Sequence, residues 1–311
     1  MAAQNVILAT DSLGGYAVHT KLSERVIHAA SPRLKFRQFT SLREAFGKNQ
    51  GDTVLINKYA TITAHGGKLT EGTDITATGV VVSQVSITVT ELGKKIDYSS
   101  KLMDLANQNV LRDLAHVLSE DAAFVINTTI EADVFNVCDI RYVGTSTNGS
   151  ALTTNGTATA TNTSVLNAFH VEEIVDYLRS NEYPPYFPNG DYACIGTTKA
   201  LRGLKRDSSW ENVALYGDVE RIMAGEAGRY QGCRFVEANV GMDTAIGVSG
   251  SEVTGEAYFF GADFAAEVLA QDIEVRVGVP TDLGRRREIG WVMLAGWGMI
   301  NETHCVKWDS A

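Results

Sequence analysis

The sequence has few residues of the kinds that usually carry chemistry, and those present are scattered. Six histidines occur among 311 residues, but none forms an HExxH pattern and no close pair shares a helical face. GxGxxG loops, GxxxxGKS/T loops and a GxSxG elbow are all absent, which removes the common nucleotide and hydrolase motifs. Reduced, partly buried thiols are expected, because no CxxC pair occurs among Cys138, Cys194, Cys233 and Cys305. We therefore predict no enzymatic activity, no catalytic residues, no cofactor and no metal site.

Long apolar runs and an excess of basic charge are also missing. No stretch approaches the roughly 18 apolar residues that a membrane helix needs, and the N-terminal residues lack the pattern of a signal peptide. The formal net charge is −10, from 27 basic and 37 acidic side chains, so naked nucleic acid would be repelled. The sequence therefore favours a soluble protein made in the cytosol, with no membrane partner.

Residues 1–50 are predicted to form an N-terminal arm, because short apolar patches alternate there with polar residues. From Lys21 to Lys48, seven basic side chains against two acidic ones give a local charge of +5. One interpretation is a solvated, irregular segment. The other is an arm that lies on acidic surfaces of sister subunits or faces a packaged polyanion. We favour sister subunits, because the rest of the chain is acidic, and expect contacts from Arg25, Arg33, Lys35 and Arg37.

Residues 51–98 read as a long β-hairpin. "GDTVLINKYATITA" is rich in β-branched residues, and "HGGKLTEGTD" is a turn-rich tip with three glycines. On the return strand, Val85 and Ile87 share one face, whereas Gln84, Ser86 and Thr88 share the other. An isolated two-stranded hairpin is marginally stable in water, so this one needs another surface to lie on.

Residues 99–143 are predicted to hold one long helix, capped by Ser99 or Ser100 and continuing without Pro or Gly to about Phe135. At 1.5 Å per residue it would be on the order of 50 Å long. Apolar and small residues recur at helical spacing on one face: Leu111, Leu114, Leu118, Ala122, Val125, Thr129 and Ala132. Val110, Val117 and Phe124 form a neighbouring stripe.

The remainder is predicted to be a mixed α/β region followed by terminal strands. Residues 144–164 carry no charge and almost no large apolar side chain, so we expect a polar surface loop rich in Gly, Thr and Asn. Residues 165–269 alternate amphipathic helices with short apolar strands, and residues 270–311 contain strands that return to the core. The elements do not alternate regularly as βαβ units, so the fold class is α+β.

This layout resembles the major capsid proteins of tailed bacteriophages, which have the Hong Kong 97 (HK97-like) fold. The similarity covers nearly the whole chain. It rests on the order of four short strings: "GDTV" at 51–54, "LTEG" at 69–72, the "G…ID" strand end at 93–97 and the "G…G…FVE" strand at 228–237. Each string alone is weak, whereas their order and spacing are specific.

The resemblance implies an N-terminal arm (1–50), an extended loop (51–98), a peripheral domain with a spine helix (99–143) and an axial domain (165–269), with 270–311 rejoining the peripheral domain. It also implies a head subunit that assembles into hexamers and pentamers of an icosahedral shell around double-stranded DNA. The protein would be made in the bacterial cytoplasm and reside in the virion. Expected partners are further copies of the chain, a separate scaffolding protein, a portal and, optionally, a decoration protein. Packaged DNA would be near only non-specifically.

The tip of the predicted hairpin is expected to contact a neighbouring subunit. The partners of the hairpin would be other copies of the chain, which explains why so long a hairpin carries no catalytic or ligand-binding residues. The residues assigned to this contact are Gly66, Gly67, Lys68, Glu71, Gly72 and Asp74.

Two other classes of function stay open at this point. The Thr/Asn-rich region is compatible with a β-rich extracellular binding protein, against which the missing signal peptide argues. A hydrolase of unrecognised type is the other, since "HGG" at 65–67 is similar to an esterase oxyanion loop, although the matching elbow is missing. The basic run "GRRRE" at 284–288 reads as a solvated turn rather than a phosphate site. Rings or shells of purified protein would identify a capsid subunit.

Overall fold

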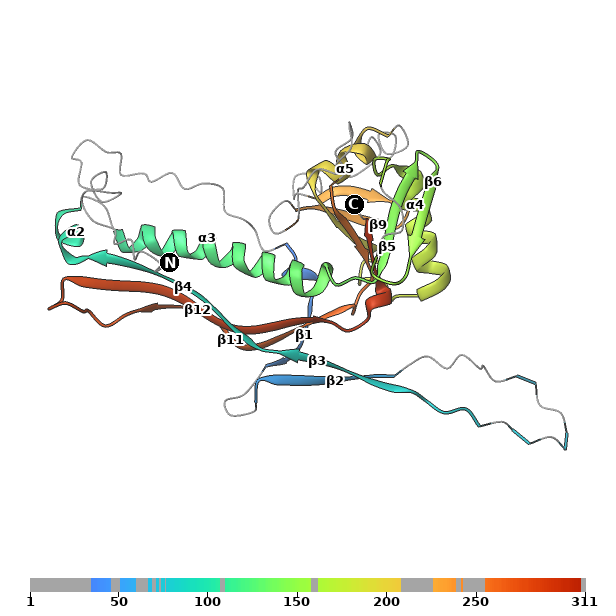
Figure 1. Cartoon of the computed structure of the whole chain (residues 1–311), viewed down its shortest axis with the longest axis horizontal. Helices are drawn as coiled ribbons and strands as arrows, with labels where there is room; N and C mark the ends of the chain where they lie inside the picture. Colours follow the sequence, from blue (N-terminus) through green and yellow to red (C-terminus); the bar gives the residue numbers. More distant parts are fainter. Residues whose placement is uncertain are drawn as a thin grey trace.

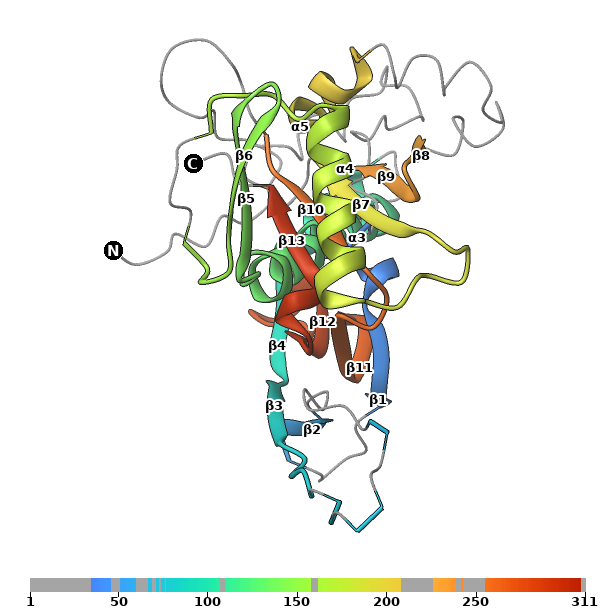
Figure 2. The same ribbon diagram turned by 90° about the vertical axis from the view of Figure 1, so that its right-hand side faces the viewer.

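The computed structural model describes most of the chain, as an elongated body from which a hairpin projects (Figures 1 and 2). The described residues are 35–45, 51–59, 67–68, 71–72, 74–75, 77–106, 110–157, 162–207, 226–238, 242 and 255–308. They form one four-stranded sheet, one seven-stranded sheet and one two-stranded hairpin. The predicted α+β class is therefore confirmed. No helix in the described part of the chain has the length and apolar character needed to span a membrane.

The four-stranded sheet has the order β1-β11-β12-β4 and lies beneath a long helix (Figure 1). Its strands are β1 (Ser41–Ala45), β11 (Ala265–Val277), β12 (Arg286–Met299) and β4 (Thr90–Ser99). Ile289, Trp291 and Met293 are buried, whereas the residues between them are less so, because side chains alternate across a strand. The buried face packs against the helix, and the root of the hairpin crosses part of the other face.

The helix is interrupted near its start, which corrects the prediction of one continuous helix. Ser99 accepts a hydrogen bond from the Leu102 N–H and so caps α2 (Ser100–Leu105), as predicted. The chain turns extended at Ala106 (ψ 134°), and α3 (Val110–Ile130) then continues into the π-helical turn η2 (Glu131–Phe135). The continuous part is thus about 40 Å long rather than 50 Å.

The buried face of α3 was predicted only in part. Leu114, Leu118 and Ala122 are buried as expected, and the stripe continues through Ile126 and Ile130. The predicted second stripe is not a core surface, because Val117 and Phe124 are exposed and only Val110 is buried. One apolar stripe is enough to pack α3 on the sheet, because only one side of the helix faces it.

The seven-stranded sheet forms the second body and has the order β6-β5-β13-β10-β7-β9-β8. Its strands are β5 (Ile140–Ser146), β6 (Gly149–Thr153), β7 (Tyr192–Gly196), β8 (Glu226–Tyr230), β9 (Cys233–Glu237), β10 (Ala257–Phe260) and β13 (Cys305–Trp308). The associated helices are α4 (Ala168–Tyr177), its π-helical extension η3 (Leu178–Glu182) and α5 (Thr198–Lys205). β7 and β10 are buried along their whole length, as expected of central strands.

Three segments differ from the predicted layout. The region expected to be a polar loop at 144–164 begins with the end of β5 and the whole of β6, which pair antiparallel. β13 joins the seven-stranded sheet beside β5 and β10, rather than returning with β12 to the helix-covered sheet. Conversely, β11 belongs to the helix-covered sheet from Ala265 onward, ahead of the expected boundary at 269/270.

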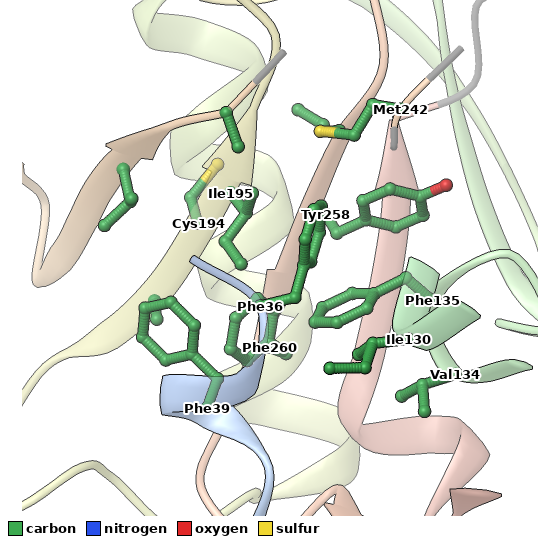
Figure 3. Close-up of a cluster of buried hydrophobic side chains, with 14 of the residues drawn as sticks. Phe36, Phe39, Ile130, Val134, Phe135, Cys194, Ile195, Met242, Tyr258 and Phe260 are labelled. Carbon is green, nitrogen blue, oxygen red and sulfur yellow. The ribbon is translucent and has the colours of Figure 1, made fainter. Parts of the chain in front are cut away.

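An aromatic cluster joins the two bodies (Figure 3). The centroid of the Phe135 ring, at the end of η2, lies 5.0 Å from that of Phe36 and 5.3 Å from that of Phe260. Both ring pairs are edge-to-face. Phe39 of the short 3₁₀ turn η1 (Arg37–Phe39) packs on Phe260 at 5.1 Å. A second 3₁₀ turn, η4 (Glu302–His304), leads from the helix-covered sheet into β13. The end of the long helix is therefore fixed against the seven-stranded sheet.

The hairpin consists of β2 (Thr53–Tyr59) and β3 (Val82–Thr88) and extends away from both bodies (Figures 1 and 2). Its paired part is shorter than the predicted range 51–98. Residues from Thr90 onward pair with β12 instead, so one strand path serves the hairpin and then the helix-covered sheet. This continuity ties the direction of the hairpin to that of the sheet.

Candidate assembly surfaces

The root of the hairpin is built into the subunit. Val54 and Ile87 are buried in a small separate cluster with Ala266, Val268 and Ile300. The Val89 N–H donates to the Asp52 carbonyl at 2.7 Å, which closes the base of the two strands. These contacts hold the hairpin at a defined place on the subunit.

Two glycines of β12 permit this close approach. A Cβ at Gly298 would lie 2.8 Å from Ile87 Cγ1, and a Cβ at Gly296 would lie 2.4 Å from the Thr88 carbonyl oxygen. Separations below 3.0 Å are not found for real Cβ atoms, so larger residues would push β3 off the sheet. The alternation of glycine with Trp297 and Met299 thus leaves one face of β12 bare where the hairpin crosses it.

Beyond its root, the hairpin exposes apolar side chains that its own subunit does not cover. Leu55 is 60% exposed and Tyr59 is 69% exposed, and the segment at 80–82 exposes three consecutive valines. The β2 side chains alternate between exposed and half-buried, so neither face of the outer part is sealed. Apolar surface of this kind on a projecting element is typical of a protein–protein contact.

The predicted tip residues lie at the far end of this hairpin. Gly67, Lys68, Glu71, Gly72 and Asp74 are all exposed, whereas Gly66 lies outside the described residues. Gly72 has φ +84°, a backbone conformation that favours glycine and suits a turn. Their contact with a neighbouring subunit stays a prediction.

Of the four predicted arm residues, Lys35 and Arg37 lie in the described part of the chain, and contact of the arm with a sister subunit stays a prediction. Arg25 and Arg33 lie outside the described residues. Lys35 Nζ donates to the Glu237 carbonyl, and the Arg37 guanidinium contacts the buried Glu267 carboxylate at 2.8 Å. Lys35 and Arg37 therefore bind their own subunit, and Arg37 also lies 3.6 Å from Asp272. The sequence showed an excess of positive charge here but not which carboxylates would pair with it.

The titratable residues singled out in the sequence are dispersed or buried wherever the structure describes them. The described residues contain no cluster of three or more His, Cys, Asp or Glu side chains placed to hold a metal ion. All four cysteines are buried, and burial raises the pKa of the Cys194 and Cys233 thiols. His65 lies outside the described residues. The basic run at 284–288 lies at the turn between β11 and β12, where the Arg285 guanidinium is 4.0 Å from the Asp282 carboxylate.

His170 is the most strongly perturbed histidine, and its role is structural. It is fully buried on α4, with Nδ1 3.4 Å from the Tyr142 hydroxyl and Nε2 3.4 Å from Ser164 Oγ. Burial lowers its pKa from 6.5 to about 4, because a charged imidazolium would be poorly solvated there. A hydrogen bond with the Ser146 backbone opposes this shift only in part.

This burial predicts a loss of stability in mild acid. Below pH 6.5 the unfolded chain takes up a proton at His170 that the folded chain accepts only near pH 4. The stabilisation that comes from keeping His170 neutral is therefore complete above pH 6.5. It declines as the pH falls toward 4, so that the free energy of unfolding drops by about 2 kcal/mol between pH 7 and pH 5. Urea unfolding at the two pH values measures it. His170→Gln should lose this part of the pH dependence, whereas the same change at the exposed His116 should keep it; equal slopes for all three proteins would contradict the assignment.

Comparisons with known proteins agree with this geometry. The model of the phage capsid family matches residues 14–278, and the chain belongs to that family. The capsid subunit of cyanophage Pam1 is similar in structure, with 16% identity, a TM-score of 0.72 and full coverage of both chains. The cyanophage P-SCSP1u capsid (11% identity, TM-score 0.68) covers 97% of this chain and 94% of its own. The Helicobacter pylori bacteriophage KHP30 capsid (13%, TM-score 0.67) covers 94% and 95% respectively. No curated protein sequence matches.

The chain is therefore a structural protein of the phage head, and its fold is the one found in phage capsid subunits. The capsid resemblance seen in the sequence is confirmed.

Proposed function

We propose that this chain assembles into hexamers and pentamers that close into an icosahedral shell around double-stranded DNA. The observation that carries this proposal is the hairpin, which is anchored in its own subunit and exposes apolar side chains beyond the root. A fixed root and an uncovered free end suit an arm that lies on the next copy, and repetition of that contact generates a ring.

The net charge of −10 supports a purely structural relation to the packaged DNA, which would be held by enclosure rather than by a basic binding surface. The scaffolding protein, portal and decoration protein implied by the sequence resemblance are part of the same proposal. So are the virion as the final location and the bacterial cytoplasm as the place of synthesis.

The direct test is assembly of the purified chain, with and without co-expressed scaffolding protein. We expect closed shells, or capsomer rings that shells are built from, in negative-stain images and native mass spectra. Light scattering should then show particles whose amount rises with protein concentration. A stable monomer across salt and protein concentrations, with or without scaffolding protein, would contradict the proposal.

A further inference from the structure

Among the described residues, the outer half of β11 has no strand partner on the side away from β12. β1 pairs with β11 only as far as Leu269, opposite Ala45. From Glu274 to Val277, β11 pairs regularly with β12 on one side, after an irregular stretch between Gln271 and Glu274, and within the described residues no strand lies on its other side. Such an edge presents unpaired backbone groups and can serve as a template for a further strand.

The hydrogen-bond pattern shows which backbone groups face outward. The Gly278 N–H donates to the Glu288 carbonyl at 2.9 Å, so this residue faces β12. Alternation in an antiparallel ladder then turns the backbone groups of Arg276 and Glu274 toward β12 as well. Those of Val275 and Val277 must point to the open side.

Side chains along this edge are sorted into two kinds. Ile273, Val275 and Val277 are apolar and exposed, and Val275 is 47% exposed although its cross-strand partner Trp291 is buried. Glu274 and Arg276 project from the opposite face and contact each other at 2.8 Å. An uncovered edge with an apolar stripe favours association with another strand unless something protects it.

We propose that the β11 edges of two copies pair antiparallel about a two-fold axis at Val275, so that their four-stranded sheets become one continuous sheet. This pairing lets Val275 exchange two backbone hydrogen bonds with its symmetry mate. It places Glu274 of each copy opposite Arg276 of the other, twice. The regular part of the edge is thus complementary to itself in charge, and the exposed Val275 side chains of the two copies meet at the axis.

Charge selects this register over its neighbours. Moving the axis to Glu274 places the two Glu274 carboxylates directly opposite each other. Moving it to Ile273 places Asp272 opposite Glu274. Like charges at directly opposed positions are destabilising, whereas opposite charges there stabilise an antiparallel pair. Of these three axes, only the one at Val275 opposes no like charges.

This inference rests on the proposed shell and adds a second kind of contact to it. Figure 1 shows the turn between β11 and β12 at the end of the molecule away from the hairpin tip, so the two contacts do not compete. A two-fold contact closes on itself and cannot build a ring, so it must link subunits of different rings. One strand pair is a small contact, but a shell repeats it many times.

Cysteine cross-linking in assembled full-length shells tests the pairing. At a two-fold axis through residue 275, the two Cα atoms of Val275→Cys lie about 5.5 Å apart, within the range that a disulfide accepts. Background should be low, because the native cysteines are buried. We expect mild oxidation to convert most subunits of this variant to covalent dimers.

Val279→Cys is the matched control, since Val279 is 83% exposed on the same edge. Because position 279 is four residues from the axis, the Cα atoms of the two Val279→Cys residues would lie about 27 Å apart and should not cross-link. Intact shells of Val275→Cys without dimers would overturn the pairing and leave the shell itself in place. Dimers from Leu283→Cys without dimers from Val275→Cys would replace it by a contact between the turns of neighbouring subunits. Failure of the unmodified chain to form any shell would overturn both.

Charge reversal separates contacts across the axis from those within a subunit. Glu274→Arg alone, or Arg276→Glu alone, puts like charges opposite each other twice in every contact and should lower the shell yield about tenfold. Co-expression of the two variants restores opposite charges across the axis, while each subunit keeps its internal repulsion. We therefore expect the mixture to assemble better than either variant alone. Equal yields for the mixture and the single variants would overturn the proposed register.

Discussion

Removal of residues 65–74 is expected to leave a folded subunit that no longer closes shells. The root of the hairpin is held by Val54 and Ile87 in their own small cluster, which the deletion does not touch. The tip residues are exposed, and charges such as Lys68 and Glu71 contribute only ~0–1 kcal/mol to the subunit at such positions. Against a neighbour the same residues can fix register, and many copies multiply a small contribution.

Circular dichroism and thermal melting should show an unchanged fold with a Tm within about 2–4 °C of the original. Electron microscopy should show at least a tenfold loss of closed shells. A second variant, in which the same ten positions carry a flexible Gly/Ser segment, separates the loss of length from the loss of side chains. Normal shells from both variants would show that the tip is not an assembly element. An unfolded deletion variant would show that it belongs to the subunit core.

Sequence periodicity predicted those elements whose partners lie nearby or whose pattern is long. The hairpin was predicted from the alternation of its residues and α3 from helical spacing, because both patterns persist over many residues. β7 was predicted as a short buried strand, and all five of its positions are buried. The break at Ala106 gave no such signal, since neither Pro nor Gly marks it. Its cause is tertiary, because α2 lies against β4 while α3 packs along the sheet.

Strand partners distant in the sequence could not be predicted. β6 carries Gly, Ser and Thr and looks like a loop until β5 pairs with it, and β13 lies only a few residues after β12 yet joins the other sheet. For the assembly surfaces, sequence indicated an exposed tip but missed the open edge of β11. That edge depends on which part of β11 pairs with β1 (Ser41–Ala45), and no local sequence pattern records this pairing.

A buried ion pair near the aromatic cluster is expected to be essential for stability. Lys307 of β13 lies opposite Tyr258 of β10, and its Nζ contacts the Glu256 carboxylate at 2.8 Å and the Asn136 side-chain oxygen at 3.0 Å. Both charged residues are almost fully buried, and the Tyr258 hydroxyl donates to Glu131 at 3.0 Å. Two contacts therefore link the end of the long helix to the seven-stranded sheet, one from Lys307 to Asn136 and one from Tyr258 to Glu131.

Lys307→Met should reduce the free energy of unfolding by about 3–5 kcal/mol, because it leaves the Glu256 carboxylate buried without its cation. Urea unfolding at pH 7 measures the change. The double variant Lys307→Met/Glu256→Gln should recover much of the loss, since no unpaired buried charge then remains. Lys205→Met is the matched control: it breaks the more exposed pair with Glu237, 3.0 Å apart, and should cost at most about 1 kcal/mol. Equal losses for Lys307→Met and Lys205→Met would show that the buried pair does not fix the helix to the sheet.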